Sequence, residues 1–192
     1  MRNIRDEGQW LIRMVENLLS ITRIGGGSAA LRKELEAAEE VLASVSGKFQ
    51  QRFPDVKLSL TVPEDPLFAP MDAILVEQVL MNLLENAAVH GGSACIRLSV
   101  ERLADAACFT VWDDGAGVAP ELLPDIFSPS LAGNADRSDD RRNMGIGLSV
   151  CSSIVRAHGG TISAENAHEG GAVFRFALPM AQSIQEELGY ED

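Results

Sequence analysis

The spacing of apolar residues changes along the chain and predicts which elements it forms. From Arg2 to Ile24 they step by seven, three, four and three, at Ile4, Leu11, Met14, Leu18 and Ile21. This is the seam of a coiled coil or helical bundle, and a lone helix would leave it exposed. We therefore expect partner helices from a second copy or from sequence before Met1. Gly25-Gly26-Gly27-Ser28 is predicted to end the helix and form a hinge.

After the hinge the pattern alternates between strand and helix periods. The expected elements are, in order, an edge strand in 29–35, a helix over 36–52, a strand over 56–62, a loop over 63–70, a helix over 72–90, a hairpin of 94–103 with 107–113, a helix over 148–158 and a hairpin of 161–165 with 172–178. Helices mixed with mostly antiparallel strands predict an α+β fold of packed layers.

One long stretch lacks either period. Between Gly115 and Gly145 the chain is rich in Pro, Gly, Asp, Ser and Arg, with a short helical hint at 122–127. Loops of this length inside a domain are usually functional or mobile. Residues 180–192 form an acidic tail.

The helix expected over 72–90 carries two asparagines one turn apart. Steps of 100° turn Val76, Leu80, Leu83, Leu84 and Ala87 toward the sheet, and turn Gln78, Asn82, Glu85 and Asn86 away from it. An ordinary solvated face is the simple interpretation, but Asn is a poor helix former. The amides of Asn82 and Asn86 therefore suggest a ligand. An Asn carbonyl is a neutral oxygen ligand that suits a Mg²⁺ ion with its waters and phosphate oxygens.

Two glycine-containing stretches follow. Asp113 ends the apolar run 108–112, where its carboxylate can accept a hydrogen bond from an exocyclic amine such as that of adenine. Gly115 and Gly117 allow a tight turn and close approach of a ligand, although a plain Asp-Gly turn has the same sequence. Gly145-Ile146-Gly147-Leu148 stands where the long loop is expected to become a helix, and a helix N-terminus binds anions. A flexible loop end is the alternative there.

Composition narrows the class of protein. With 46% apolar residues in 192, the chain can bury a domain core, and its net charge of -12 disfavours a nucleic-acid surface. The cations of 137–142 are a candidate site for a polyphosphate. Cys95, Cys108 and Cys151 have no metal or disulfide spacing and are expected to be buried thiols. Neither a membrane span nor a signal peptide is evident, so we expect a cytoplasmic location.

Taken together, these stretches resemble the catalytic and ATP-binding domain of sensor histidine kinases, within the superfamily of gyrase, Hsp90 and MutL-type ATPases. Residues 78–87 resemble the N box, 113–117 the G1 box, Leu123 to Phe127 the F box and 145–148 the G2 box. The resemblance covers about Ala29 to Pro179. It implies a Bergerat-type two-layer sandwich, a mixed sheet covered by helices, preceded by one bundle-forming helix.

The resemblance also implies roles. Asn86 binds Mg²⁺, Asn82 supports the phosphates, Asp113 reads adenine, and residues 118–144 form a lid over ATP. The residues that it assigns to nucleotide binding are Asn82, Asn86, His90, Asp113, Gly115, Gly117, Phe127, Gly145, Ile146, Gly147 and Leu148. It divides the chain into residues 1–24 as the second helix of a dimerisation and phosphoacceptor hairpin, 25–28 as hinge, 29–179 as catalytic domain and 180–192 as tail.

Some positions depart from the family pattern. Val89 replaces a basic residue near the phosphates, His90 replaces an aromatic beside the base, and Ser130 replaces the second Phe of the F box. Ala132 replaces a frequent Arg. Arg137, Arg141 and Arg142 are candidate contacts for the γ-phosphate in its stead, since guanidinium suits phosphate oxygens, with a solvated loop charge as the alternative for each.

Three functions compete. The first is transfer of the ATP γ-phosphate to a histidine on a hairpin whose first helix is absent here, because no histidine of the chain has the phosphoacceptor pattern. Its implied partners are that hairpin, a response regulator and a second copy in a larger intact protein, of which this is the cytoplasmic portion. The second is a hydrolytic or serine-directed relative, which would need a general-base Glu where Asn82 stands. The third is a degenerate module that binds nucleotide or dimerises without phosphotransfer.

Overall fold

The computed structural model describes residues 31–128 and 139–180, and over 139–146 it describes the backbone only. The strands are β1 (Glu34–Ala37), β2 (Lys57–Thr61), β3 (Phe68–Met71), β4 (Cys95–Leu103), β5 (Ala106–Asp113), β6 (Thr161–Asn166) and β7 (Ala172–Pro179). The helices are α2 (Ala38–Arg52), α3 (Ala73–Glu85), a π-helical turn η1 (Asn86–His90), a 3-10 turn η2 (Leu123–Asp125) and α5 (Asp139–Ala157). The helix expected over 1–24, the hinge and the acidic tail from 181 onward lie outside the described residues.

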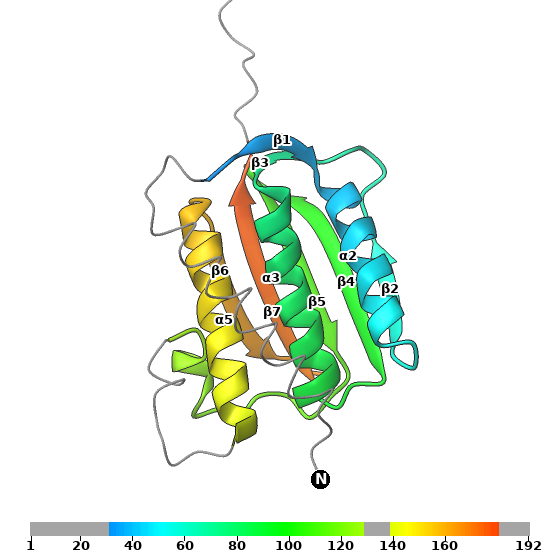
Figure 1. Ribbon diagram of the computed structural model, residues 1–192, viewed down its shortest axis with the longest axis vertical. Coiled ribbons are helices and arrows are strands. Elements are labelled where there is room, and N and C mark those ends of the chain that lie inside the picture. The colour runs from blue at the N-terminus through cyan, green and yellow to red at the C-terminus, as the bar shows by residue number, and fades with distance from the viewer. Residues whose placement is uncertain (1–30, 129–138, 181–192) are drawn as a thin grey trace, which may run out of the picture.

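The domain has two layers. Five strands form a sheet in the order β2-β4-β5-β7-β6, in which only the β2–β4 pair is parallel. Figure 1 shows α2, α3 and α5 side by side over one face of this sheet. A short antiparallel ribbon of β1 and β3 crosses one end of the helical layer. The expected α+β sandwich of a mixed sheet and a helical layer is confirmed.

The core lies between the layers because each central strand alternates. Phe109 on β5 and Phe176 on β7 are register partners, are almost fully buried, and stack with ring centroids 4.6 Å apart. From the helical layer, α3 packs a row of apolar side chains against the sheet, namely Leu75, Val76, Val79, Leu80, Leu83 and Leu84. Each such side chain contributes about 1.5–3 kcal/mol on burial. The apolar face predicted for this helix is therefore confirmed, and it fixes where the end of α3 meets the sheet.

The ribbon corrects two expectations. Residues 63–70 were expected to be a loop, yet β3 begins at Phe68, and the first strand lies at Glu34–Ala37 rather than within 29–35. Ala69 and Met71 are fully buried, while Pro70 pairs with Leu35 on the outer side. A strand this short has too few residues to show a period of two, and the prolines before and within it, Pro63, Pro66 and Pro70, imitate a loop.

The helical layer brings further corrections. Glu85, expected on the face away from the sheet beside Asn82 and Asn86, is 5% exposed and pairs with Arg52 of α2. The neighbouring helix covers that side of α3, which helix periodicity alone does not reveal. The last helix begins at Asp139 rather than at 148.

The cysteines are free thiols. Cys108 and Cys151 are buried as expected, whereas Cys95 at the start of β4 is only half-buried. Burial raises the pKa of the Cys151 thiol to about 12, so this thiol stays protonated. Within the described residues, no helix has the length and apolar content needed to cross a bilayer.

Candidate functional site

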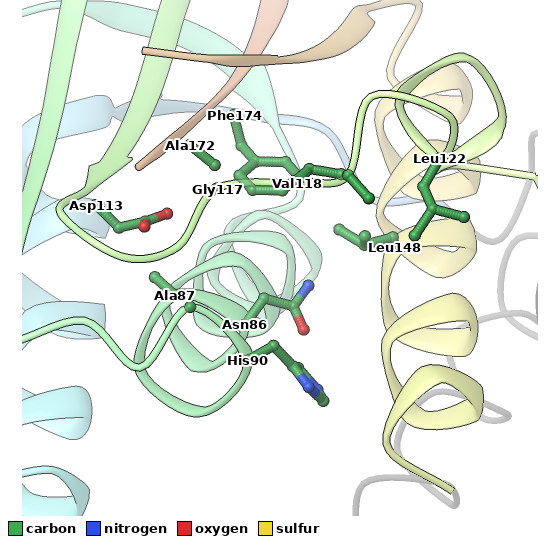
Figure 2. A pocket seen from close by; sticks show the side chains of 12 residues that line it. Asn86, Ala87, His90, Asp113, Gly117, Val118, Leu122, Leu148, Ala172 and Phe174 are labelled. Carbon is green, nitrogen blue, oxygen red and sulfur yellow. The ribbon is translucent and has the colours of Figure 1, made fainter. Parts of the chain in front are cut away.

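A cavity of about 320 Å³ opens where the C-terminal end of α3 meets the loop after β5, the helix α5 and the start of β7. Figure 2 shows side chains from all four elements converging on it. The lining residues are Asn86, Ala87, His90, Gly91, Asp113, Gly117, Val118, Ala119, Leu122, Leu148, Ala172 and Phe174. Its wall is mostly apolar with a few polar groups, which is the usual make-up of a small-molecule site.

Asn86 occupies the junction between α3 and the π-helical turn. The turn is closed by the Gly91 N–H, which donates to the Asn86 carbonyl at 3.0 Å. The Asn86 side-chain nitrogen Nδ2 is buried and has no hydrogen-bond partner. An unpaired buried amide costs about 1–3 kcal/mol. A group kept at that cost beside a cavity is suited to a ligand, and π-helical turns often mark functional sites.

Asp113 ends β5, and the residue is 2% exposed. Its Oδ1 accepts hydrogen bonds from the Ser93 hydroxyl at 3.1 Å and from the Gly115 N–H at 2.9 Å. No described residue donates to Oδ2, and Figure 2 shows the carboxylate turned toward the cavity. The carboxylate is therefore oriented by its own protein, with one oxygen left as an acceptor for a bound molecule.

The adjacent acidic residue, Asp114, has a structural role. Asp114 Oδ1 accepts from the Ala94 N–H at 3.0 Å and from the Cys95 N–H at 2.9 Å. It thereby satisfies the backbone where β4 begins. The sequence pair Asp113-Asp114 thus divides into one residue that faces the cavity and one that supports the strand.

The glycines of this turn serve packing as well as access. A Cβ at Gly115 would lie 2.4 Å from the Gly91 carbonyl oxygen, so this glycine lets two backbone segments meet and does not itself line the cavity. Gly117 does line it and has φ of +73°. Next to it, the Asn166 side chain bonds both backbone groups of Val118 at 2.7 Å. The turn is held in place by the second hairpin.

Asn82 lies one turn before Asn86 and faces α5. Its Nδ2 is 3.7 Å from the Cys151 sulfur, and a Cβ at Gly147 would lie 3.9 Å from its Cγ. The structure therefore brings the asparagine-bearing helix α3 and the glycine-containing stretch 145–148 of α5 next to each other. Leu148 is fully buried and lines the cavity, whereas Asn82 does not line it.

The expectation for the 145–148 stretch was wrong in one respect. Gly145, Ile146, Gly147 and Leu148 lie inside α5, which begins at Asp139, and so they do not form a helix N-terminus. A Cβ at Gly147 would make only an ordinary van der Waals contact with the Asn82 side chain, so the packing of α5 beside Asn82 does not require a glycine there.

Other predicted residues have mixed placements. His90 lines the cavity. Phe127 does not, but its ring contacts Phe174, which does, edge to face at 6.3 Å between centroids. Arg141 and Arg142 lie in α5, where only the backbone is described, and Arg137 lies outside the described residues.

Sequence reasoning did not identify several of the residues that line the cavity. Ala172 and Phe174 begin β7, and Gly91 follows the π-helical turn. Phe174 was visible as a strand residue, but alternation predicts only that it is buried, not that its neighbour is a cavity. Val118, Ala119 and Leu122 fall in the stretch expected to be a lid.

The donors also bear on a metal. Among the described residues, no three His, Cys, Asp or Glu side chains are grouped as a metal site would require. An ion held chiefly by phosphate oxygens and water, with one Asn carbonyl, needs no such group. Asn86 offers one carbonyl oxygen for that arrangement, whereas its buried, unpaired Nδ2 is a donor that suits a phosphate oxygen and not the cation.

Comparisons with known proteins agree on one family. The sequence profile of the histidine kinase-, DNA gyrase B-, and HSP90-like ATPases matches residues 71–182. The sensor protein KdpD of Clostridium acetobutylicum is 38% identical over 180 residues, which are 93% of this chain but 20% of that protein. The histidine-protein kinase AfsQ2 of Streptomyces coelicolor is 33% identical over 95% of this chain and 33% of its own length.

Solved structures share the fold. The catalytic domain of histidine kinase ThkA superposes with a TM-score of 0.65 at 26% identity, over 77% of this chain and 96% of that domain. Full-length ShkA in complex with AMPPNP superposes with a TM-score of 0.72 at 25% identity, over 93% of this chain and 38% of ShkA. The chain thus spans between a fifth and two fifths of the curated relatives it matches.

Proposed function

Because the chain belongs to the family of histidine kinase-, DNA gyrase B-, and HSP90-like ATPases, we propose that it is the ATP-binding catalytic portion of a two-component sensor histidine kinase. It binds Mg-ATP and transfers the γ-phosphate to a histidine on a helical hairpin. The observation that carries the proposal is a single cavity lined by Asn86, Asp113 and Leu148, each from a different one of the stretches singled out in the sequence.

The chemistry of the lining supports an adenine nucleotide. The buried Asp113 carboxylate has one oxygen free of described donors, which suits the exocyclic amine of adenine. Asn86 supplies a carbonyl ligand to the Mg²⁺ that accompanies the phosphates, and Asn82, next to Gly147, supports the phosphates. Magnesium neutralises phosphate charge when bound. The protein contributes orientation and exclusion of water, by which phosphoryl transfer is mainly catalysed.

The other sequence assignments are part of the proposal. Residues 118–144 cover the nucleotide, and Arg137, Arg141 or Arg142 contacts the γ-phosphate. Residues 1–24 are the second helix of the hairpin, joined by the hinge at 25–28, so the intact protein is a dimer in the cytoplasm. A relative of this domain, ThkA, has been solved in complex with the response regulator TrrA. By analogy, a response regulator would receive the phosphate here.

The hydrolytic alternative needs a general-base Glu, and no described glutamate lines the cavity. Glu85 is the acid nearest to Asn86 in sequence, but it is buried and paired with Arg52. A carboxylate engaged with a guanidinium on the far side of α3 cannot activate a water at the phosphates. The degenerate module remains the competing proposal, supported by Val89 and Ala132 where the family pattern has cations.

The test has two stages. First, Mg-dependent ATP affinity is measured by calorimetry for the wild type and for Asp113→Asn, in which we expect a loss of about tenfold to a hundredfold because a charged hydrogen bond is removed. Then the chain is mixed with ATP and a separately supplied phosphoacceptor hairpin. Transfer supports the kinase, binding without transfer supports the degenerate module, and equal affinity of Asp113→Asn and wild type would sink the site assignment.

A further inference from the structure

Ser93 is a buried hydroxyl beside the cavity that no family motif accounts for. It is 5% exposed and lies between the π-helical turn and β4. Its backbone N–H donates to the Ala87 carbonyl at 3.3 Å, which anchors the residue to the end of the helix. Its hydroxyl donates to Asp113 Oδ1 at 3.1 Å, across twenty positions of sequence. Ser93 therefore connects the amide-bearing helix with the carboxylate.

The hydroxyl has little freedom to move. A Cβ added at Gly91 would lie 2.8 Å from the Ser93 oxygen, and one added at Gly115 would lie 2.7 Å from it. The backbones on both sides thus pass at close range. Because Asp113 has only acceptor atoms when ionised, the hydroxyl must point its hydrogen at the carboxylate.

Two donors then act on one oxygen. The Ser93 hydroxyl and the Gly115 N–H both approach Oδ1, while Oδ2 receives no bond from a described residue. Rotation of the carboxylate would break both bonds at once. The arrangement therefore fixes which oxygen is offered to the ligand and in which direction.

We propose that Ser93 is a positioning residue for recognition of the base: it holds Asp113 so that Oδ2 faces an exocyclic amine and rejects a carbonyl at the same place. The inference rests on the proposed function, in which Asp113 reads adenine. It goes further in assigning the discrimination between 6-amino and 6-oxo purine nucleotides to the Ser93–Asp113 pair rather than to Asp113 alone.

The experiment compares three triphosphates on the whole chain: ATP, purine riboside triphosphate, which lacks the 6-amino group, and GTP, which carries a 6-oxo group. The affinity ratio of ATP to purine riboside triphosphate isolates the amine contact. In Ser93→Ala we expect this ratio to fall about fivefold, with affinity for purine riboside triphosphate unchanged, because only the directed contact is lost. The preference for ATP over GTP should fall as well.

A purely structural role predicts another outcome. If Ser93 only supported the loop, Ser93→Ala would weaken all three nucleotides equally and leave the ratio unchanged, which would overturn the proposal. Ser46→Ala is the matched control, since Ser46 is 6% exposed and bonds the Leu42 carbonyl at 2.7 Å in α2. It should leave every affinity and ratio as in the wild type.

Failure of the proposed function would look different. In that case the wild type would not bind ATP, or Asp113→Asn would leave the ATP to purine riboside ratio intact. If Asp113→Asn removes the ratio while Ser93→Ala preserves it, the function stands and the inference about Ser93 is wrong. Thermal unfolding of each variant confirms that the folded protein is what binds.

Discussion

The polar groups at the two ends of α3 differ in whether they are hydrogen-bonded within the protein. At the N-terminal end, the Asp72 carboxylate accepts from the Leu75 N–H at 3.3 Å, and the Asp72 N–H donates to His158 Nε2 at 3.0 Å. Lys33 then donates to the His158 carbonyl at 3.0 Å. At the C-terminal end, Asn86 keeps an amide nitrogen buried and unpaired beside the cavity.

The difference predicts that one end of the helix contributes to stability and that the other, in the proposed function, contributes to binding. An N–H can only donate, so His158 Nε2 is unprotonated, and Nδ1 carries the hydrogen that reaches the Ile154 carbonyl at 2.8 Å. This hydrogen-bonded network, with a neutral His158 ring at its centre, joins α3 to α5. The open end has its hydrogen-bonding capacity left for a ligand. Stability and affinity should therefore respond to different residues of the same helix.

The largest expected effect is on the backbone of the cavity wall. A Cβ at Gly171 would lie 1.7 Å from the Asp113 carbonyl oxygen, and φ there is +79°. Gly171→Ala should lower the free energy of unfolding by more than about 3 kcal/mol, because two backbone segments must separate. Gly170, with φ of +97° and no atom near its added Cβ, is the matched control. Urea unfolding should show Gly170→Ala losing only about 1–2 kcal/mol from strain.

The next prediction tests whether Glu85, unlike its neighbour Asn86, has a structural role. Arg52→Ala leaves the Glu85 side chain, 7% exposed, without its cation. Removing one partner of a buried pair is costly, but since Arg52 is 31% exposed we expect about 2 kcal/mol of destabilisation. Arg175→Ala, which breaks an exposed pair with Glu165, should cost no more than about 0.5 kcal/mol. Equal losses by urea unfolding in both variants would contradict a structural role for Glu85.

A smaller effect is expected in the pH dependence of stability at the N-terminal end of α3, where His158 is hydrogen-bonded. Burial lowers the pKa of His158, so below pH 6.5 the unfolded chain binds more protons than the folded one. Stability from the neutral ring is complete above that pH and declines as the pH falls through it. His158→Leu should cost about 1–3 kcal/mol at neutral pH, because the Asp72 N–H is left unpaired. The penalty should shrink on acidification, measured by unfolding between pH 7.5 and 5.5, with nucleotide affinity unchanged at neutral pH.

The smallest effect on stability concerns Asn86 itself. Asn86→Ala removes a buried amide nitrogen that has no partner, and the relief of its desolvation offsets the packing lost with the side chain, so the free energy of unfolding should stay within about 0.5 kcal/mol of the wild type. Mg-dependent ATP affinity should nevertheless fall strongly. A variant that unfolded readily, or that bound Mg-ATP normally, would remove the contrast between the two ends.

Much of the fold could be predicted where an element was long enough to show its hydrophobic period. The helix over 72–90 and both hairpins have enough residues to show an apolar face, and each lies within a few positions of its predicted bounds. The β1–β3 ribbon was missed because Ala69 and Met71 face the core from a strand of four residues. The start of α5 was missed because residues 139–147 are polar and glycine-rich.

In the candidate site, likewise, only residues with a recognisable local pattern could be predicted. Asn86 could be singled out because Asn is a poor helix former, Asp113 because it ends an apolar strand before glycines, and Leu148 because it closes a glycine-containing stretch. Ser93 and Phe174 could not, since a serine in a loop and a phenylalanine in a strand have many ordinary uses. Their importance comes from contacts across the sequence, to Asp113 in one case and to the cavity in the other.

By itself the amino-acid order determined the family resemblance, the two-layer fold and the local chemistry of each motif, because these depend on neighbouring residues and regular spacing. Tertiary structure alone decided that Glu85 is paired with Arg52, that Gly115 packs against Gly91 and that Asn86 keeps an unpaired amide. Burial and pairing are set by what packs alongside from distant parts of the chain, and no local pattern contains that information.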